Sequence, residues 1–267
     1  MSAGDKPWAD GPFPLIKPEN CGPAVQNADP NKPIQGLDCS IWEMAAIHNV
    51  FLRGLNAIYL QAVNVGARGT EQDKRDFVEF AAIWAKGIHE HHDLEETYVF
   101  PTIERITGVE GIMAANVQQH VAFHDGLAQY EGYLESVLEG KEKYDGEKFR
   151  GIIDSFGEVL GQHLNDEIPT LRGLHQYDDK VDWLAFQKGI EEKLLEVVDA
   201  PGVKDKWYPF VVSNNHKEAF DGTFKRFPAT PWFISLILDW FFVPKYKNLW
   251  RFSSCTVKGV RRELPFA

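Results

Sequence analysis

Residues 89–101 read HEHHDLEETYVFP, and this stretch decides the fold and the chemistry of the chain. Its first eight positions hold three histidines, one aspartate and three glutamates. A solvated helix surface and one half of a metal site would both show such a cluster. The two interpretations differ in which of these groups face the protein interior.

Four amphipathic segments include and surround this stretch. They predict helices over residues 40–65, 70–106, 109–139 and 147–168, with Ser40 as the first N-cap, a bend near Pro101 and the last helix ending before Pro169. No period-two alternation predicts a strand between about residues 40 and 172. Short turns rich in glycine and charge separate the helices. The pattern therefore predicts an all-α fold, an antiparallel four-helix bundle.

Counting about 100° per residue shows which groups on the second helix face the core. His91 and Glu95 fall on the apolar stripe. His92 and Glu96 fall at its edge, and we expect His92 to orient a ligand rather than bind metal. His89 points away. The stripe itself is defined by Phe77, Phe80, Trp84 and Ile88.

The other helices also carry polar groups on their apolar stripes. His48 lies on the stripe of the first helix, and the segment HVAFH places His120 and His124 on that of the third. In HLNDE of the fourth helix, His163 and Glu167 repeat the four-residue spacing of the second. Side chains four residues apart on a helix are neighbours and can share one ion.

Seven polar groups are thus predicted to point into one core: His48, His91, Glu95, His120, His124, His163 and Glu167. One such histidine would be an ordinary hydrogen-bonded core residue, but charged glutamates are almost never buried without a partner. Imidazole and carboxylate suit iron, zinc or manganese, and this number of donors suits two bridged ions better than one. Cysteine is absent from the set, which disfavours structural zinc. Glu131 lies about two turns beyond His124 and is predicted to be too distant to bind.

The combination of His48, HHDLEETYVFP, HVAFH and HLNDEIP resembles the hemerythrin HHE cation-binding family, in particular fungal hemerythrin-like proteins. The resemblance covers roughly residues 40–172. It implies two iron ions bridged by Glu95, Glu167 and an oxo or hydroxo group, with the five histidines as further ligands and one open position for dioxygen. It does not divide the histidines between the two irons.

Outside the bundle we expect an irregular N-terminal arm over residues 1–39 and a C-terminal extension over 173–267 that packs on the bundle. The extension contains a helix predicted near 182–199 and the apolar run PWFISLILDWFFVP at 231–244. That run is too short to cross a bilayer, which needs about 20 residues. The extension and the longer helices distinguish the chain from the small oxygen carriers.

Bulk composition limits the remaining functions. The chain has 267 residues and a net charge of −11, which argues against nucleic acid or an anionic membrane as a partner. The three cysteines form no disulfide framework, and no secretory signal or transmembrane segment is evident, so a cytoplasmic protein is expected.

Three functions remain open at this point. The first is reversible dioxygen binding, as a carrier, store or sensor. The second is a non-haem di-iron oxygenase or oxidase that acts on a small organic substrate. The third is iron or nitric-oxide handling. Whether the chain is an enzyme is not decided by its sequence.

Overall fold

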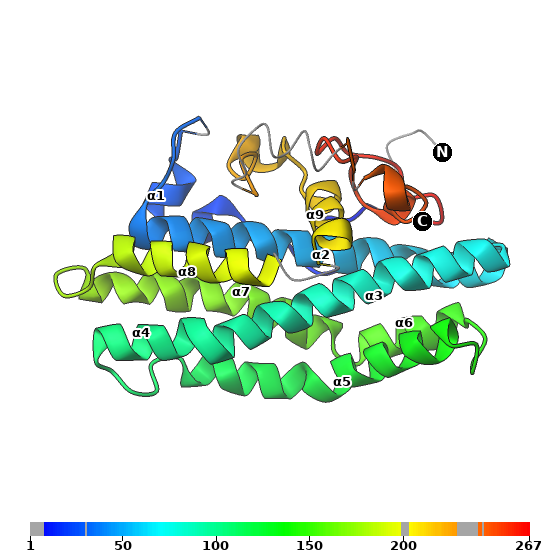
Figure 1. The fold of residues 1–267 in the computed structure, drawn as a ribbon, viewed down its shortest axis with the longest axis horizontal. Coiled ribbons are helices and arrows are strands. Elements are labelled where there is room, and N and C mark those ends of the chain that lie inside the picture. The colour runs from blue at the N-terminus through cyan, green and yellow to red at the C-terminus, as the bar shows by residue number, and fades with distance from the viewer. Residues whose placement is uncertain (1–7, 30, 199–202, 229–239, 242) are drawn as a thin grey trace.

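The computed structural model describes residues 8–29, 31–198, 203–228, 240–241 and 243–267. Its centre is a bundle of four long helical rods that lie side by side (Figure 1). In chain order the rods are α2 (Gly36–Arg68); α3 (Glu71–Leu94) continued by η2 (Glu95–Val99) and α4 (Phe100–Thr107); α5 (Ala114–Leu138); and α6 (Gly146–Asp154) followed by α7 (Gly157–Gly173). Within the described residues there is no strand beyond one isolated bridge. The predicted all-α bundle is confirmed.

Shorter elements flank the bundle. They are η1 (Pro18–Cys21), α1 (Pro23–Gln26), η3 (Leu174–Tyr177), α8 (Trp183–Val198), α9 (Val203–Asn214), η4 (Ala219–Gly222), η5 (Pro244–Tyr246) and η6 (Trp250–Phe252). The arm is held on α2 by two buried amides: Asn49 bonds both backbone groups of Ile16, and Asn56 bonds those of Phe13. α8 and α9 lie against α2, and α9 also reaches α3. Most of the apolar run, residues 231–239 and 242, lies outside the described residues.

Two predicted helix starts are wrong. α2 begins at Gly36, before the predicted cap Ser40, and its N-cap is Gln35. α5 begins at Ala114 rather than at Val109, because Gly108 and Gly111 adopt positive φ angles and form a turn. Thr70, in contrast, caps α3 through a reciprocal capping box with Asp73.

The fourth rod also departs from its prediction. It is interrupted at Phe156, whose φ of −134° is not helical, and it continues through Pro169 to Gly173. Proline within a helix removes one backbone hydrogen bond. The helix persists because Ile168, Leu171 and Leu174, on both sides of the proline, are buried in the core.

The second rod contains one π-helical turn, η2, immediately before the predicted bend at Pro101. The N–H of Phe100 bonds the carbonyl of Glu95, five residues earlier. At about 100° per residue, the buried residues Val99, Phe100 and Ile103 would centre about 90° away from the stripe of α3. The extra residue in the wide turn brings them back onto the core.

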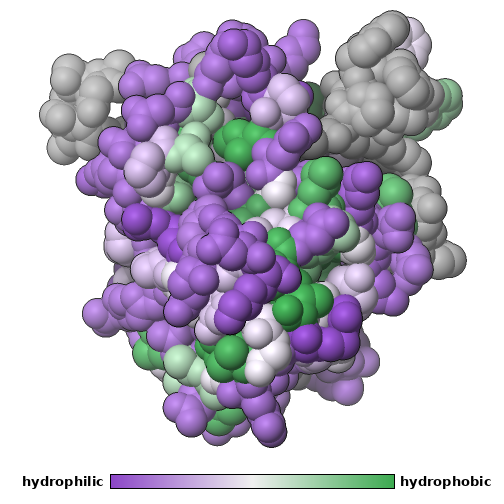
Figure 2. Space-filling model, turned by 90° about the vertical axis from the view of Figure 1, so that its left-hand side faces the viewer, coloured by the Kyte–Doolittle hydropathy of each residue, from purple (hydrophilic) through white to green (hydrophobic). Residues whose placement is uncertain are grey.

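Among the described residues, no helix is long and apolar enough to span a membrane. Seen from the end that carries α4 and the start of α8, the surface is mostly hydrophilic, with hydrophobic groups between charged ones (Figure 2). Single exposed leucines, such as Leu184 and Leu195 on α8, are ordinary for a globular protein.

Candidate metal centre

Two groups of buried ligand atoms meet in the middle of the bundle. One group holds His92, Glu95, His120 and His163, and the other holds His48, His91 and Glu95. Within each group the ligand atoms lie within 4.8 Å of one another. Glu95 belongs to both groups, so its carboxylate lies where it can bridge two ions.

Glu167 of α7 completes the cluster. Its Oε2 lies 3.5 Å from Nε2 of His48, and the side chain is fully buried. Burial raises the pKa of Glu167 well above its usual value, and the neighbouring Glu95 raises it further. Burial likewise raises the pKa of Glu95, with Glu96 as the next cause. The pair therefore needs protons or cations to be stable in the core.

Five polar atoms of the cluster have no hydrogen-bond partner among the described residues: both oxygens of Glu95, both oxygens of Glu167, and Nε2 of His92. The contact of Glu95 Oε1 with His91 Nε2, at 2.9 Å, is close but does not satisfy either oxygen as a hydrogen bond. Buried polar atoms are normally paired, because an unpaired one costs about 1–3 kcal/mol. Unpaired oxygens and nitrogens facing one another are the donor set that a metal ion satisfies.

Three histidines are held from outside the cluster through Nδ1. His48 Nδ1 bonds the carbonyl of Leu164 at 2.8 Å, and a carbonyl can only accept. His120 Nδ1 donates to Glu96 at 2.7 Å, and His163 Nδ1 to the amide oxygen of Gln119 at 3.1 Å. The proton therefore sits on Nδ1, and the Nε2 lone pair points inward, as in metal-binding histidines.

The inward nitrogens face one another at short range. Nε2 of His48 lies 2.9 Å from Nε2 of His91, and Nε2 of His120 lies 3.0 Å from Nε2 of His163. Burial lowers the pKa of His91 to about 3 and that of His163 to about 2, so these rings are neutral near pH 7. In His120 and His163 both Nε2 atoms carry a lone pair, and two lone pairs 3.0 Å apart repel unless a cation lies near both. The residues present thus fit metal ions.

The structure brings together six of the seven predicted residues: His48, His91, Glu95, His120, His163 and Glu167. It does not bring His124, whose side chain is 75% exposed and lies beside Asp125. The buried positions of α5 are Asn116, His120, Phe123, Leu127, Tyr130, Tyr133 and Leu134. The centre of this buried stripe lies on the side of His120 that faces away from His124. The predicted stripe was rotated toward His124 because the aromatic residues of α5 were left out of it.

His92 is the residue that sequence reasoning placed in a supporting role. It is buried, and its ring centroid lies 4.4 Å from that of His120 and 5.3 Å from that of His163. α3 packs between α2 and α5. His91 therefore faces His48 on α2, while the adjacent His92 faces His120 on α5. The adjacent histidines His91 and His92 were the sequence signal for this arrangement. A helix that packs between two neighbours buries a wider stripe than a helix with one neighbour, so both can face the core.

Glu131 lies in neither ligand group. It is half-buried, and its Oε1 lies 3.9 Å from Nδ1 of His89 on the outside of the bundle. Burial raises the pKa of Glu131, and the nearby His89 and His124 oppose that shift.

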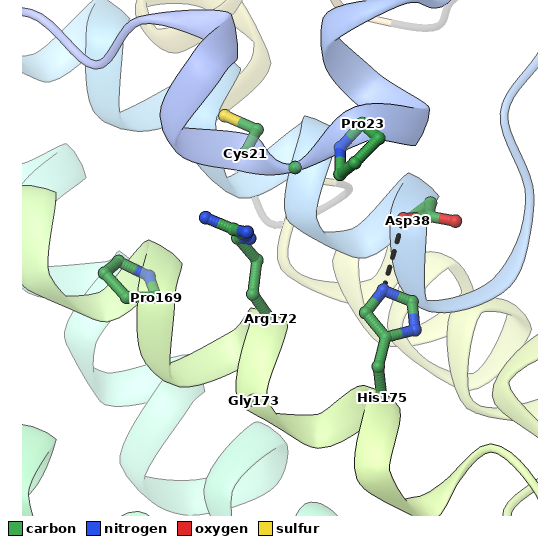
Figure 3. Close-up of a pocket in the computed structure, with 8 residues that line it drawn as sticks. Cys21, Pro23, Asp38, Pro169, Arg172, Gly173 and His175 are labelled. Carbon is green, nitrogen blue, oxygen red and sulfur yellow. Dashed lines mark hydrogen bonds and ion pairs between the residues drawn. The ribbon is translucent and has the colours of Figure 1, made fainter.

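Two surface cavities of about 350 and 430 Å³ occur in the described structure, and cluster residues line neither of them. The first lies between η1 and the end of α7, where Arg172 points at the turn that begins α1 and His175 bonds Asp38 (Figure 3). The second lies beside Phe13 and Gly161. Neither of these two cavities opens onto the metal centre.

The core of this helical bundle holds unpaired carboxylate oxygens that face histidine nitrogens. Such a core is that of a cation-binding helical protein. The family described as "Hemerythrin HHE cation binding domain" matches residues 39–171, and the chain belongs to this family. It is 33% identical over 263 residues to "Dimeric xanthone biosynthesis cluster protein R11" from Cryptosporiopsis sp. (strain 8999), an alignment that covers 98% of this chain and 94% of that protein. No solved structure matches the chain.

Proposed function

We propose that the chain is a non-haem di-iron protein that binds dioxygen. The observation that carries the proposal is the pair of ligand groups that share Glu95. Glu95 and Glu167 would bridge the two ions, and five histidines would supply the nitrogen ligands: His48, His91, His92, His120 and His163. In this proposal His92 replaces His124 of the predicted ligand set.

The donor chemistry supports iron. Imidazole and carboxylate ligands suit iron, manganese and zinc, whereas thiolate is absent from the cluster. When bound, two neighbouring irons supply the electrons with which dioxygen is held or reduced. The remaining contributions come from the chain itself.

Aromatic rings keep water away from the cluster. Phe51 lies 5.2 Å from the ring of His91, and Phe123 lies 5.1 Å from that of His92 and 5.4 Å from that of His163. Phe51 and Phe123 are buried. A dry wall strengthens electrostatic interactions inside the site and limits side reactions. It is also the surrounding that a small apolar gas favours.

An oxygenase or oxidase that acts on a small organic substrate is the second candidate. It is favoured by the relative from Cryptosporiopsis, whose name refers to a biosynthesis cluster. Neither of the two cavities described above reaches the proposed ligands, so neither is a substrate pocket of this site. The two candidates share the metal centre and differ in what enters it.

Metal analysis and optical spectroscopy test the proposal. Protein produced in iron-supplemented medium should hold two irons per chain, and its spectrum should change reversibly between anaerobic and aerobic buffer. A stoichiometry of one, or retention of zinc in preference to iron, contradicts the di-iron proposal. If the protein reacts with dioxygen only once, and its original spectrum returns only after reductant and substrate are added, the enzyme is favoured.

A further inference from the structure

His91 has the most exposed side chain among the five histidines of the cluster. Its side chain is 12% exposed, whereas the other four histidines of the cluster are 7% exposed or less. This exposed edge offers one route from solvent to the metal centre. The residues packed around His91 line that route.

Trp207 of α9 is connected to His91 through the ring of Phe51. The rings of Phe51 and His91 lie 5.2 Å apart, and Trp207 stacks on Phe51 with centroids 5.5 Å apart and planes at 30°. Trp207 also stacks on the buried Phe210, at 5.5 Å and 11°. One face of the indole is thus fixed to the core, while part of the ring remains exposed.

Gly87 makes this placement possible. A Cβ atom at Gly87 would lie 2.1 Å from the indole ring of Trp207, so the ring rests directly on the backbone of α3. Gly87 lies one helical turn before His91. A glycine inside a helix costs about 1 kcal/mol relative to alanine, and here its missing side chain is what lets the indole approach.

We propose that Trp207 is a gate residue that determines the size of molecules that reach His91 and the metal centre. The identity of the molecule that passes the gate, dioxygen or a small substrate, rests on the proposed function. Among the described residues the indole N–H has no hydrogen-bond partner, so turning the ring outward breaks only apolar contacts. The C-terminal part of the chain, outside the matched family region, thereby controls a site built by the bundle.

Histidine acylation of the metal-free, full-length protein tests the gate. Diethyl pyrocarbonate modifies accessible neutral imidazoles, and peptide mass spectrometry gives the rate at each histidine. A gate open in at most about a tenth of molecules predicts that Trp207→Ala raises the rate at His91 at least about tenfold. Gly87→Ala should do the same, since its methyl group displaces an intact Trp207.

Internal references and a matched variant make the result specific. His89 and His124, which are 55% and 75% exposed, should react equally in all variants. Trp183→Ala removes an indole of α8 that packs on Phe186, and it should leave the rate at His91 unchanged. An unchanged rate in both gate variants, or an equal rise in Trp183→Ala, overturns the gate.

A second measurement on iron-loaded protein addresses size. Trp207→Ala should accelerate iron removal by a bulky chelator more than removal by a small one, relative to the unchanged protein. Equal acceleration of both contradicts size selection. If the acylation result holds but the protein binds no iron, the gate stands and the di-iron function fails, so the two proposals are separately testable.

Discussion

The carboxylate of Glu96 accepts a hydrogen bond from Nδ1 of His120, with Oε1 and Nδ1 2.7 Å apart. Glu96 is half exposed, while His120 is buried among the proposed ligands. Adjacent glutamates therefore have different roles, since Glu95 points into the cluster and Glu96 holds a ligand from outside.

Glu96→Ala should weaken metal binding without emptying the site. Loss of a partner that orients a metal-binding histidine typically costs about 10–100-fold in metal affinity. Glu96→Gln keeps an acceptor oxygen and should lose less. Competition titration with a chelator measures both variants. Loss of both metal ions from Glu96→Ala, with retention in Glu95→Ala, would falsify the assignment of the two glutamates.

His92→Ala should lose metal, whereas His124→Ala should keep the stoichiometry of the unchanged protein. The reason is burial: His92 faces two other ligands, and His124 is exposed on the outer side of α5. Metal content after dialysis, with the helical content of each variant as a folding control, gives the answer. If His124→Ala loses metal and His92→Ala keeps it, His124 is a ligand and His92 is not.

Glu43→Gln should stabilise the protein at alkaline but not at acid pH. Burial under α8 raises the pKa of Glu43 to about 7, and Glu191 contributes to the shift. The folded state then holds a proton that the unfolded state releases above pH 4.5, so stability is lost as the pH rises from 4.5 through 7. The neutral glutamine avoids this loss, which is roughly 3 kcal/mol.

Urea unfolding of metal-free protein at pH 5 and pH 8 measures the effect. Glu191→Gln is the matched variant, because it removes only the neighbouring charge and should give a smaller gain at pH 8. An equal gain from Glu43→Gln at both pH values would show that packing, not ionisation, is responsible.

Gly126→Ala and Gly132→Ala, both on α5, should change stability in opposite directions. A Cβ at Gly126 would lie 2.5 Å from Cβ of Phe156, at the break between α6 and α7, whereas nothing lies within 4 Å of one at Gly132. Overpacking costs about 1–3 kcal/mol, and alanine in an open helical position gains about 0.5–1 kcal/mol over glycine. Denaturant midpoints compare the two. Equal shifts of the denaturant midpoint in the two variants would mean that Phe156 moves aside at no cost in stability.

The periodicity of apolar residues was sufficient to predict the bundle and six of the seven cluster residues, because each lies on a stripe that any neighbouring helix would bury. His124 was misplaced because the predicted stripe of the third helix included aliphatic residues, Val117 and Leu138 among them, that are only half-buried in the structure. The aromatic residues Phe123 and Tyr130 fix the stripe instead, since their large rings must be enclosed.

The role of His92 depended on information that a single helix does not contain. A periodicity count assumes one buried direction, but α3 has α2 on one side and α5 on the other. The break at Phe156 and the continuation through Pro169 likewise depend on contacts with other elements. Local propensity at Pro169 predicted an end, and the buried Ile168 and Leu171 prevent it.

The π-helical turn at Glu95–Val99 has a consequence for comparing this chain with its relatives. It acts as a one-letter insertion inside an otherwise regular helix. A relative whose second helix lacks the insertion can align without a gap on one side of the turn only. Gap penalties that forbid breaks within helices would then pair its counterpart of Glu95 with Glu96. Both residues are glutamate, so the alignment would look correct while exchanging the carboxylate that points into the cluster for the one that bonds His120.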